Sequence, residues 1–271
     1  MESITFFGGG NMASAIAGGM QRAHRLPKWM TVVDPDDKVR QAWSEQFGAK
    51  VFSRVEETAC ASQCWVLAVK PQQMKDLCQA IEALRISESH CVISVAAGIR
   101  LESLREWLGS QHRLIRCMPN TPALIGRGIT GLYADMAVSS DDRRLAQLIV
   151  DCVGKSLWLD QETDLDAVTA VSGSGPAYVF RFIEAMQVAA QTLGLSPETA
   201  RLLVIETLRG ASELAAESAL TSTQLREQVT SKGGTTAAAL EVLDQEDFGG
   251  MLQRAIQRAA ARSAELSNSR S

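Results

Sequence analysis

Residues 4–13, ITFFGGGNMA, decide the fold of the amino-terminal half of this chain. Residues 4–7 are typical of a buried strand, and the glycines after them open a helix in the pattern G-x-G-x-x-A. One glycine permits the tight turn, another lets a pyrophosphate approach the backbone, and Ala13 allows close helix–strand packing. Free N–H groups at the helix N-terminus favour an anion. A glycine-rich loop in an ordinary βαβ unit is the alternative. The segment predicts a dinucleotide-binding turn made by Gly8, Gly9, Gly10, Asn11 and Met12.

A carboxylate directly follows the second predicted strand, residues 30–33. Asp34 is placed to accept hydrogen bonds from the 2′-OH of the adenosine ribose and to repel a 2′-phosphate. We therefore expect NADH or NADPH as cofactor, with NADH favoured. Two alternatives stay open: residues 34–37, DPDD, are also typical of a turn and helix cap, and Lys38 and Arg40 could reach a phosphate.

Strands and helices alternate up to about residue 160. Strands are predicted over residues 4–7, 30–33, 64–69, 91–95, 114–117, 131–133 and 156–159. Helical stretches such as 36–47, 72–84 and 101–108 separate them. Because parallel neighbours need crossover connections, this alternation favours a mostly parallel sheet covered on both faces. We predict an α/β Rossmann-type doubly wound domain over residues 1–160.

Beyond about residue 162 the sequence is helical throughout. Residues 174–176, SGP, are typical of a helix start, and Gly194 is typical of the end of that helix. Further helices are expected from residue 197 and over 223–229, 235–243 and 248–266, with 267–271 as a frayed tail. We predict an all-α dimerisation domain over residues 161–271, because small residues at helical spacing favour close packing into a homodimer. A monomeric helical core is the alternative.

The composition excludes several classes of protein. With 46% hydrophobic residues the 271-residue chain is neither disordered nor fibrous, and a net charge of −4 without a basic block argues against nucleic acid. The 3 histidines are far apart, so no metal site is expected. The 6 cysteines form no CxxC pair, which favours a reducing, cytoplasmic location. No apolar run reaches the roughly 18 residues of a membrane span.

Five further segments carry a family resemblance. Residues 67–71, LAVKP, come first, followed by SVAAG at 94–98 with RCMPNTP at 116–122. The most diagnostic are VSGSGPAY at 171–178 and VTSKGGTT at 229–236. Together with the glycine turn, these segments resemble the pyrroline-5-carboxylate reductase family, in the same order and over nearly the whole chain.

The resemblance implies a Rossmann-type domain followed by a helical domain that dimerises, often within larger rings. It implies hydride transfer from NAD(P)H to 1-pyrroline-5-carboxylate, giving L-proline, the final step of proline biosynthesis. Small residues at strand ends leave room for the cofactor. Without the resemblance, a surface cation at a strand end is as good an interpretation of Lys70 as cofactor binding, and a packing role is as good an interpretation of Ala96 and Ala97. The cofactor residues implied after the glycine turn are Ala68, Val69, Lys70, Pro71, Ala96, Ala97 and Asn120.

Residues 233–236, GGTT, precede a predicted helix, so their N–H groups can hold an anion at its N-terminus, although a loop with a helix cap is the commoner alternative. The resemblance implies that this turn binds the carboxylate of the imino acid and that Thr236 is catalytic, near the ring nitrogen. Glu162 is also implied near the substrate, with a solvated acid in a connector as the alternative. The implied substrate residues are Ser231, Gly233, Gly234, Thr235, Thr236 and Glu162.

Two rival functions stay open. A β-hydroxyacid-dehydrogenase-like reductase typically carries a lysine on its long interdomain helix, whereas residues 178–191 contain none. A non-catalytic dinucleotide-binding protein need not retain residues 231–236. Ser174 does not match the G-x-S-x-G pattern of a hydrolase nucleophile, and a helix cap is expected there instead.

Overall fold

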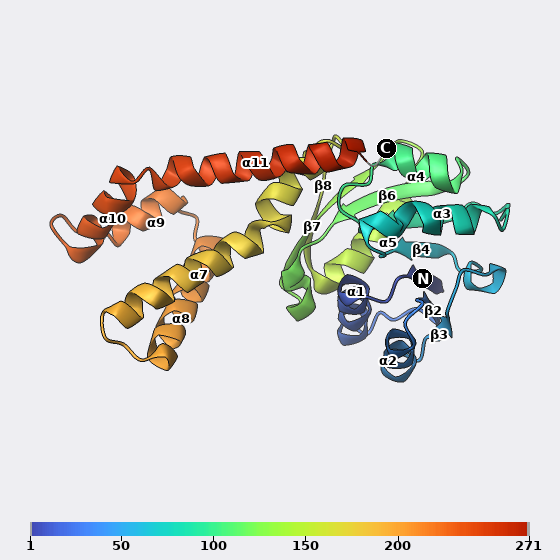
Figure 1. Ribbon diagram of the computed structural model, residues 1–271, viewed down its shortest axis with the longest axis horizontal. Helices are drawn as coiled ribbons and strands as arrows, with labels where there is room; N and C mark the ends of the chain where they lie inside the picture. Colours follow the sequence, from blue (N-terminus) through green and yellow to red (C-terminus); the bar gives the residue numbers. More distant parts are fainter. Residues whose placement is uncertain (1, 270–271) are drawn as a thin grey trace. The chain divides into compact units, whose positions relative to one another are not determined.

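The computed structural model describes residues 2–269 and contains an eight-stranded sheet of order β3-β2-β1-β4-β5-β6-β7-β8 within them (Figure 1). The strands are Ser3–Phe7 (β1), Trp29–Val33 (β2), Lys50–Phe52 (β3), Cys64–Leu67 (β4), Cys91–Ser94 (β5), Arg113–Met118 (β6), Gly128–Ala134 (β7) and Gly154–Trp158 (β8). β1 to β6 run parallel, β7 runs antiparallel to β6, and β8 runs parallel to β7. The predicted α/β doubly wound class is confirmed.

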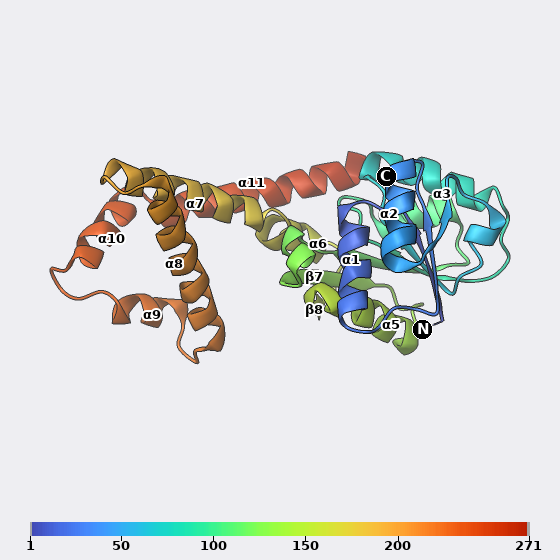
Figure 2. The same ribbon diagram turned by 90° about the horizontal axis from the view of Figure 1, so that it is seen from below.

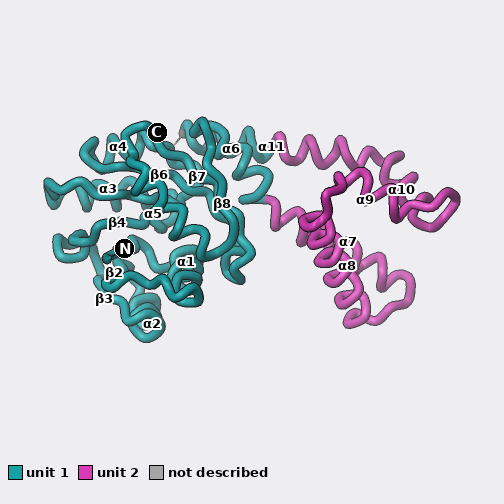
Figure 3. The backbone as a smooth tube through the Cα atoms, turned by 180° about the vertical axis from the view of Figure 1, so that it is seen from behind, with its two compact units in different colours: residues 1–174, 259–271 teal, residues 175–258 magenta. Residues whose placement is uncertain are grey.

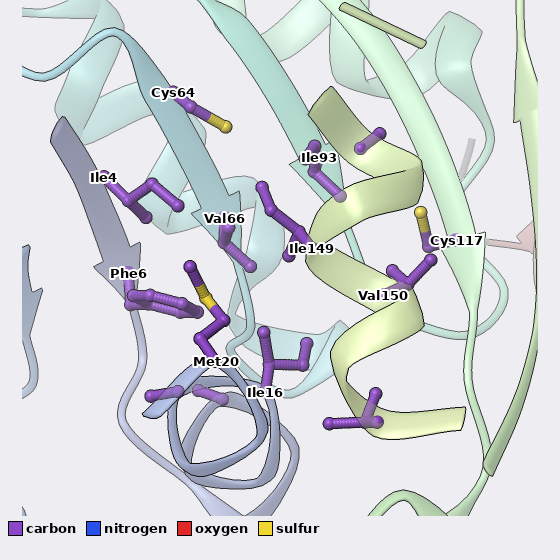
Figure 4. Close-up of a cluster of buried hydrophobic side chains, with 14 of the residues drawn as sticks. Ile4, Phe6, Ile16, Met20, Cys64, Val66, Ile93, Cys117, Ile149 and Val150 are labelled. Atoms are coloured by element: carbon purple, nitrogen blue, oxygen red, sulfur yellow. The ribbon is translucent and has the colours of Figure 1, made fainter. Parts of the chain in front are cut away.

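Helices cover both faces of this sheet. They are Asn11–Arg22 (α1), Asp37–Phe47 (α2), Met74–Glu82 (α3), Leu101–Leu108 (α4) and Ser140–Val150 (α5). Side chains of α1, α2 and α5 pack on one face, and those of α3 and α4 on the other. Figure 4 shows the first face, where Ile16 of α1 and Ile149 of α5 meet Phe6 and Val66 of the central strands. The central strands are therefore buried on both sides, as expected of parallel strands.

Strand β3 lies outside the predicted strands. It has only three residues, none of them buried, and it lies at the edge of the sheet directly after α2. Such a short, half-exposed edge strand carries no periodic signal. Strand β4 ends at Leu67, earlier than predicted, although the Ala68 N–H still donates to the Phe7 carbonyl at 2.8 Å.

The rest of the chain is helical. Its α-helices are Asp164–Val168 (α6), Gly175–Thr192 (α7), Pro197–Glu217 (α8), Ser222–Gln228 (α9), Thr235–Gln245 (α10) and Phe248–Ser269 (α11), drawn from below in Figure 2. A π-helical turn, Thr169–Gly173, connects α6 to α7. Short 3-10 turns elsewhere span Glu57–Ala59, Pro71–Gln73, Thr121–Ile125 and Asp151–Val153. The predicted all-helical character is confirmed.

Two local predictions for this part are wrong. Ser174 is no N-cap, because its backbone is itself helical (φ −83°, ψ −22°) and its N–H donates to the Thr169 carbonyl at 2.7 Å. The expected frayed tail begins too early, because α11 continues to Ser269 and Ser267 is fully buried. Residues 270–271 of that tail lie outside the described residues.

The described chain divides into two compact units, coloured separately in Figure 3. One contains the sheet together with the end of α11, and the other is Gly175–Arg258. Within Gly175–Arg258 only Ala200 and Val204 are buried apolar residues. Large apolar side chains there are exposed, among them Phe180, Leu193 and Leu202. This unit therefore has no hydrophobic core of its own, and the predicted division at residues 160/161 stays a prediction.

No helix in the described part of the chain is both long and apolar enough to cross a membrane. All 6 cysteines are free thiols.

Candidate active site

The turn after β1 can be made only by glycine at its first position. Gly8 has φ +93°, and a Cβ there would lie 2.9 Å from the carbonyl carbon and oxygen of Ala68. The Gly8 N–H donates to the Val33 carbonyl at 2.8 Å. The turn is therefore wedged between the ends of β2 and β4, where any larger side chain would clash.

The next glycine lets α2 approach. A Cβ on Gly9 would lie 2.8 Å from Nε1 of Trp43, and this indole donates to the Gly9 carbonyl at 2.9 Å. Trp43 is fully buried against Phe6, with ring centroids 5.0 Å apart. Nothing in the sequence pattern pointed to Trp43, because its contact with the turn depends on how α2 folds back.

The third glycine faces open space. A Cβ on Gly10 would meet no atom within 4 Å, so the protein itself does not require glycine there. Gly10 is the N-cap of α1, and the helix has neither a side-chain cap nor an acidic residue in its first turn. The first N–H groups of a helix have no partner within it. The uncapped turn and the empty space beside Gly10 fit a dinucleotide pyrophosphate.

Asp34 ties two turns together. Its Oδ2 accepts the Gly9 N–H at 2.8 Å, and its Oδ1 accepts the Asp36 N–H at 2.9 Å. Arg40 donates to the Asp34 backbone carbonyl at 2.6 Å and also pairs with Asp37. The carboxylate is therefore fixed beside the glycine turn, and the nearby guanidinium is already engaged.

The other predicted cofactor residues of this unit lie mostly along one edge of the sheet. Phe7 is in register with Val33 and Leu67, and Leu67 with Ser94, so β1, β2, β4 and β5 end together. The residues that follow these strands share the edge where open α/β sheets bind ligands. The predicted residues that directly continue β4 and β5 are Ala68, Val69, Lys70, Pro71, Ala96 and Ala97.

The Asn120 carboxamide is already engaged within the protein. Its Nδ2 donates to the Ser172 carbonyl at 3.1 Å, and its Oδ1 accepts the Ile129 N–H at 3.0 Å. The side chain thereby fastens β7 to the π-helical turn. Its role in cofactor binding stays a prediction.

The predicted substrate turn lies in the second unit, at the N-terminus of α10. Gly234 is the N-cap, α10 has no side-chain cap, and Gly233 has φ +72°. A Cβ on Gly234 would clash with Oγ of Ser231, whose carbonyl accepts the Gly234 N–H at 3.0 Å. Thr235 is exposed and Thr236 is half-buried. The turn therefore presents unpartnered helix N–H groups suited to a carboxylate.

Glu162 belongs to the unit with the sheet. Its Oε1 accepts the Leu101 N–H at 2.8 Å and pairs with Arg116 at 3.0 Å. Burial lowers the pKa of the Arg116 guanidinium, and the nearby Glu162 carboxylate opposes that shift. Arg116 begins one of the segments that carry the resemblance, but no site role was predicted for it, because its partner is distant in the chain.

A Rossmann-type sheet, an uncapped glycine turn and a carboxylate after β2 define a dinucleotide-binding protein. Residues 3–98 match the family model described as NADP oxidoreductase coenzyme F420-dependent, and residues 162–266 match pyrroline-5-carboxylate reductase dimerisation. A pyrroline-5-carboxylate reductase from Pseudomonas aeruginosa is 42% identical over 264 residues, covering 97% of this chain and 96% of the relative. The chain belongs to the pyrroline-5-carboxylate reductase family.

Solved structures agree with this assignment. A pyrroline-5-carboxylate reductase from Coxiella burnetii superimposes with a TM-score of 0.90 at 38% identity, covering 97% of this chain and 98% of the other. The Plasmodium falciparum pyrroline carboxylate reductase, solved with NADP bound, has a TM-score of 0.87 at 31% identity and covers 98% of each chain. The family expected from the sequence motifs is confirmed.

Proposed function

We propose that this chain reduces 1-pyrroline-5-carboxylate to L-proline with a hydride from NADH or NADPH. The observation that carries the proposal is the intact turn at residues 231–236, an uncapped helix N-terminus suited to a carboxylate, in a chain that also carries an open dinucleotide turn. Relatives named for this reaction match nearly the whole chain. A non-catalytic dinucleotide-binding protein would not need both turns.

The cofactor, the N-terminus of α10 and Thr236 have separate roles in the proposed reaction. The nicotinamide, when bound, supplies the hydride. The first N–H groups of α10, with Ser231, bind the substrate carboxylate and hold the ring in one orientation. The Thr236 hydroxyl donates a hydrogen bond to the ring nitrogen of the imine and assists protonation of that nitrogen. A protonated cyclic imine is already electrophilic, so alignment of the hydride donor and acceptor supplies most of the catalysis.

We propose that NADH is preferred to NADPH. The Asp34 carboxylate is held at the end of β2, where it would accept hydrogen bonds from a ribose 2′-OH and repel a 2′-phosphate. Of the two cations that follow β2, Arg40 is held by Asp37 and by the Asp34 carbonyl. Lys38 is exposed and is the remaining cation of this segment.

We propose that the protein works as a homodimer in the cytoplasm, and that dimers can assemble into a larger ring. The exposed apolar helices of Gly175–Arg258 need a partner surface to be buried. The match of residues 162–266 to a dimerisation model supports a second copy as that partner. Six free thiols fit a reducing compartment.

The test is an assay of NADH and NADPH oxidation with 1-pyrroline-5-carboxylate, with L-proline identified as product. We expect turnover with at least one cofactor; none with either would refute the proposal. Thr236→Ala should raise KM for the imine or lower kcat by about tenfold, the value of one hydrogen bond, without changing NADH binding. Thr236→Ser, which keeps the hydroxyl, is the matched control. An unchanged rate and KM in Thr236→Ala would remove Thr236 from the site.

A further inference from the structure

A largely buried ionic cluster lies at the first turn of α4, in the unit with the sheet. Arg100 precedes α4, Arg116 lies on β6, Glu162 follows β8 and Asp166 lies on α6. Glu162 pairs with Arg116 at 3.0 Å, and Asp166 pairs with Arg100 at 3.2 Å. The formal charges of the two arginines and two carboxylates cancel, as a buried cluster requires.

Glu162 does more than balance charge in this cluster. The oxygen that meets Arg116 also accepts the N–H of Leu101, the first residue of α4, at 2.8 Å. The N-cap residue Arg100 makes no side-chain cap of its own. Glu162 therefore caps α4 from a distant part of the chain. Its side chain is 18% exposed and that of Arg116 only 3%, so the arrangement is largely shielded from water.

The cap fixes one end of the segment between β5 and α4. The other end is fixed by the Val95 N–H, which donates to the Leu67 carbonyl at 3.1 Å. Ala96 and Ala97 lie between these two anchors. The glycine turn follows β1, with β2 and Asp34 on one side of it and β4 and β5 on the other. A dinucleotide with its adenosine half at Asp34 would therefore extend its nicotinamide half toward the segment after β5.

The cluster is also braced from the end of the chain. Oδ1 of Asp166 accepts a hydrogen bond from the Ser263 hydroxyl of α11 at 2.6 Å, and both residues are buried. Asp166 in turn holds Arg100, the residue before α4. The start of α4 is thus held by two side chains, one on its N–H group and one on its N-cap residue.

We propose that Glu162 is a positioning residue for the nicotinamide half of the cofactor, and that it acts through the first turn of α4. The proposal rests on the proposed function, which supplies the identity of the cofactor. It differs from the expectation that Glu162 contacts the substrate, because the bonded oxygen is turned toward Leu101 and Arg116. Loss of the cap would loosen the segment beside the nicotinamide and leave the adenosine side unchanged.

The test compares NADH with ADP-ribose, which lacks the nicotinamide, by calorimetric titration of the full chain. Glu162→Ala should weaken NADH binding about tenfold, as expected for loss of a helix cap, and leave ADP-ribose binding within about twofold. Glu162→Gln keeps an acceptor for Leu101 but loses the charge, so a smaller weakening of about threefold, again for NADH alone, is expected. If Glu162→Ala does not fold, the proposal is tested by whether Glu162→Gln weakens the binding of NADH more than that of ADP-ribose.

The matched control is Asp160→Asn, an exposed acid in the same loop, which should bind both ligands as the wild type does. Equal weakening of NADH and ADP-ribose, or no weakening of either, would overturn the proposal. A raised KM for 1-pyrroline-5-carboxylate with unchanged NADH binding would instead make Glu162 a substrate ligand. Binding needs no turnover, so a wild type that binds NADH but does not reduce the imine refutes the proposed function alone.

Discussion

At the scale of single residues, the Asp34 carboxylate both holds the backbone of two turns and is placed to bind the cofactor ribose. Each oxygen already accepts one backbone N–H, from Gly9 and from Asp36. A carboxylate has about four lone-pair sites, so two remain for ribose hydroxyls. The group is held in place before any cofactor binds, and this preorganisation lowers the cost of binding.

Replacing Asp34 tests the cofactor preference directly. Asp34→Ser should shift the ratio of kcat/KM for NADH over NADPH toward NADPH by about tenfold or more, because a charge-assisted hydrogen bond to the ribose and a repulsion of phosphate are both lost. The ratio is the informative quantity, since a loosened glycine turn would harm both cofactors alike. The control is Asp36→Ser, which keeps an N-cap for α2. An unaltered ratio in Asp34→Ser would mean that another residue reads the ribose.

At the scale of elements, the glycines of the β1–α1 turn have separable tasks. Gly8 has a positive φ and no room for a Cβ, whereas Gly10 has φ −68° and open space around it. The fold requires glycine at position 8. At position 10 the fold leaves open space, which we expect a ligand to fill.

Two alanine variants should therefore behave in opposite ways. Gly10→Ala should keep or slightly raise Tm, because it removes flexibility of the unfolded chain, yet weaken NADH binding about tenfold by filling the phosphate space. Gly8→Ala should lower Tm, because its Cβ would clash with the Ala68 backbone. Thermal unfolding and calorimetric titration of both variants check this. A Gly10→Ala protein that binds NADH normally would contradict the assignment of the pyrophosphate to this turn.

Elements with a local signal could be predicted from the sequence. The glycine turn, the carboxylate after β2 and the starts of α8 and α10 all depend on residues adjacent in the chain. Strand β3 could not be predicted, because three residues without a buried member show no hydrophobic periodicity. The end of α11 could not either: Ser267 is a poor helix former by type, and burial of its side chain overrides that propensity.

The candidate site divides in the same way. Residues along the carboxyl edge follow from strand order, since parallel strands end together. The bonds of Asn120 to Ser172 and of Glu162 to Leu101 join residues far apart in sequence. A single sequence gives no information on which distant polar side chains will meet, so these partners require the structure.

At the scale of the whole molecule, two buried histidines link stability to pH. His90 stacks on Trp65 with ring centroids 4.1 Å apart, and its Nδ1 lies 2.8 Å from the Ser62 carbonyl. Nδ1 of His112 accepts the His90 N–H at 3.3 Å, so His112 is neutral in the fold. Burial, with His90 and Arg113 nearby, lowers the pKa of His112 to about 4. Burial also lowers the pKa of His90, with the hydrogen bond to the Ser62 carbonyl and the charge of Glu88 opposing the shift.

The free energy of unfolding should therefore fall as pH falls. An unfolded histidine takes up a proton near pH 6.5 and folded His112 only near pH 4, so His112 alone should cost about 2 kcal/mol between about pH 7 and about pH 5. Urea unfolding followed by tryptophan fluorescence measures this. His112→Gln, which can still accept the His90 N–H, should flatten the dependence, whereas exposed His24→Gln should not. Equal slopes in both variants would contradict the assignment.

The ionic cluster at α4 also has a consequence for biosynthesis. Ser263, which bonds Asp166, and fully buried Ser267 come from the last turns of the chain, although they belong to the unit that begins with β1. A ribosome makes the sheet first, but the Asp166 carboxylate has no hydroxyl partner until α11 has emerged. A chain truncated before residue 259 would leave that carboxylate and the surface under α11 uncovered. We therefore expect cellular proteases to degrade such a chain faster than one that carries α11.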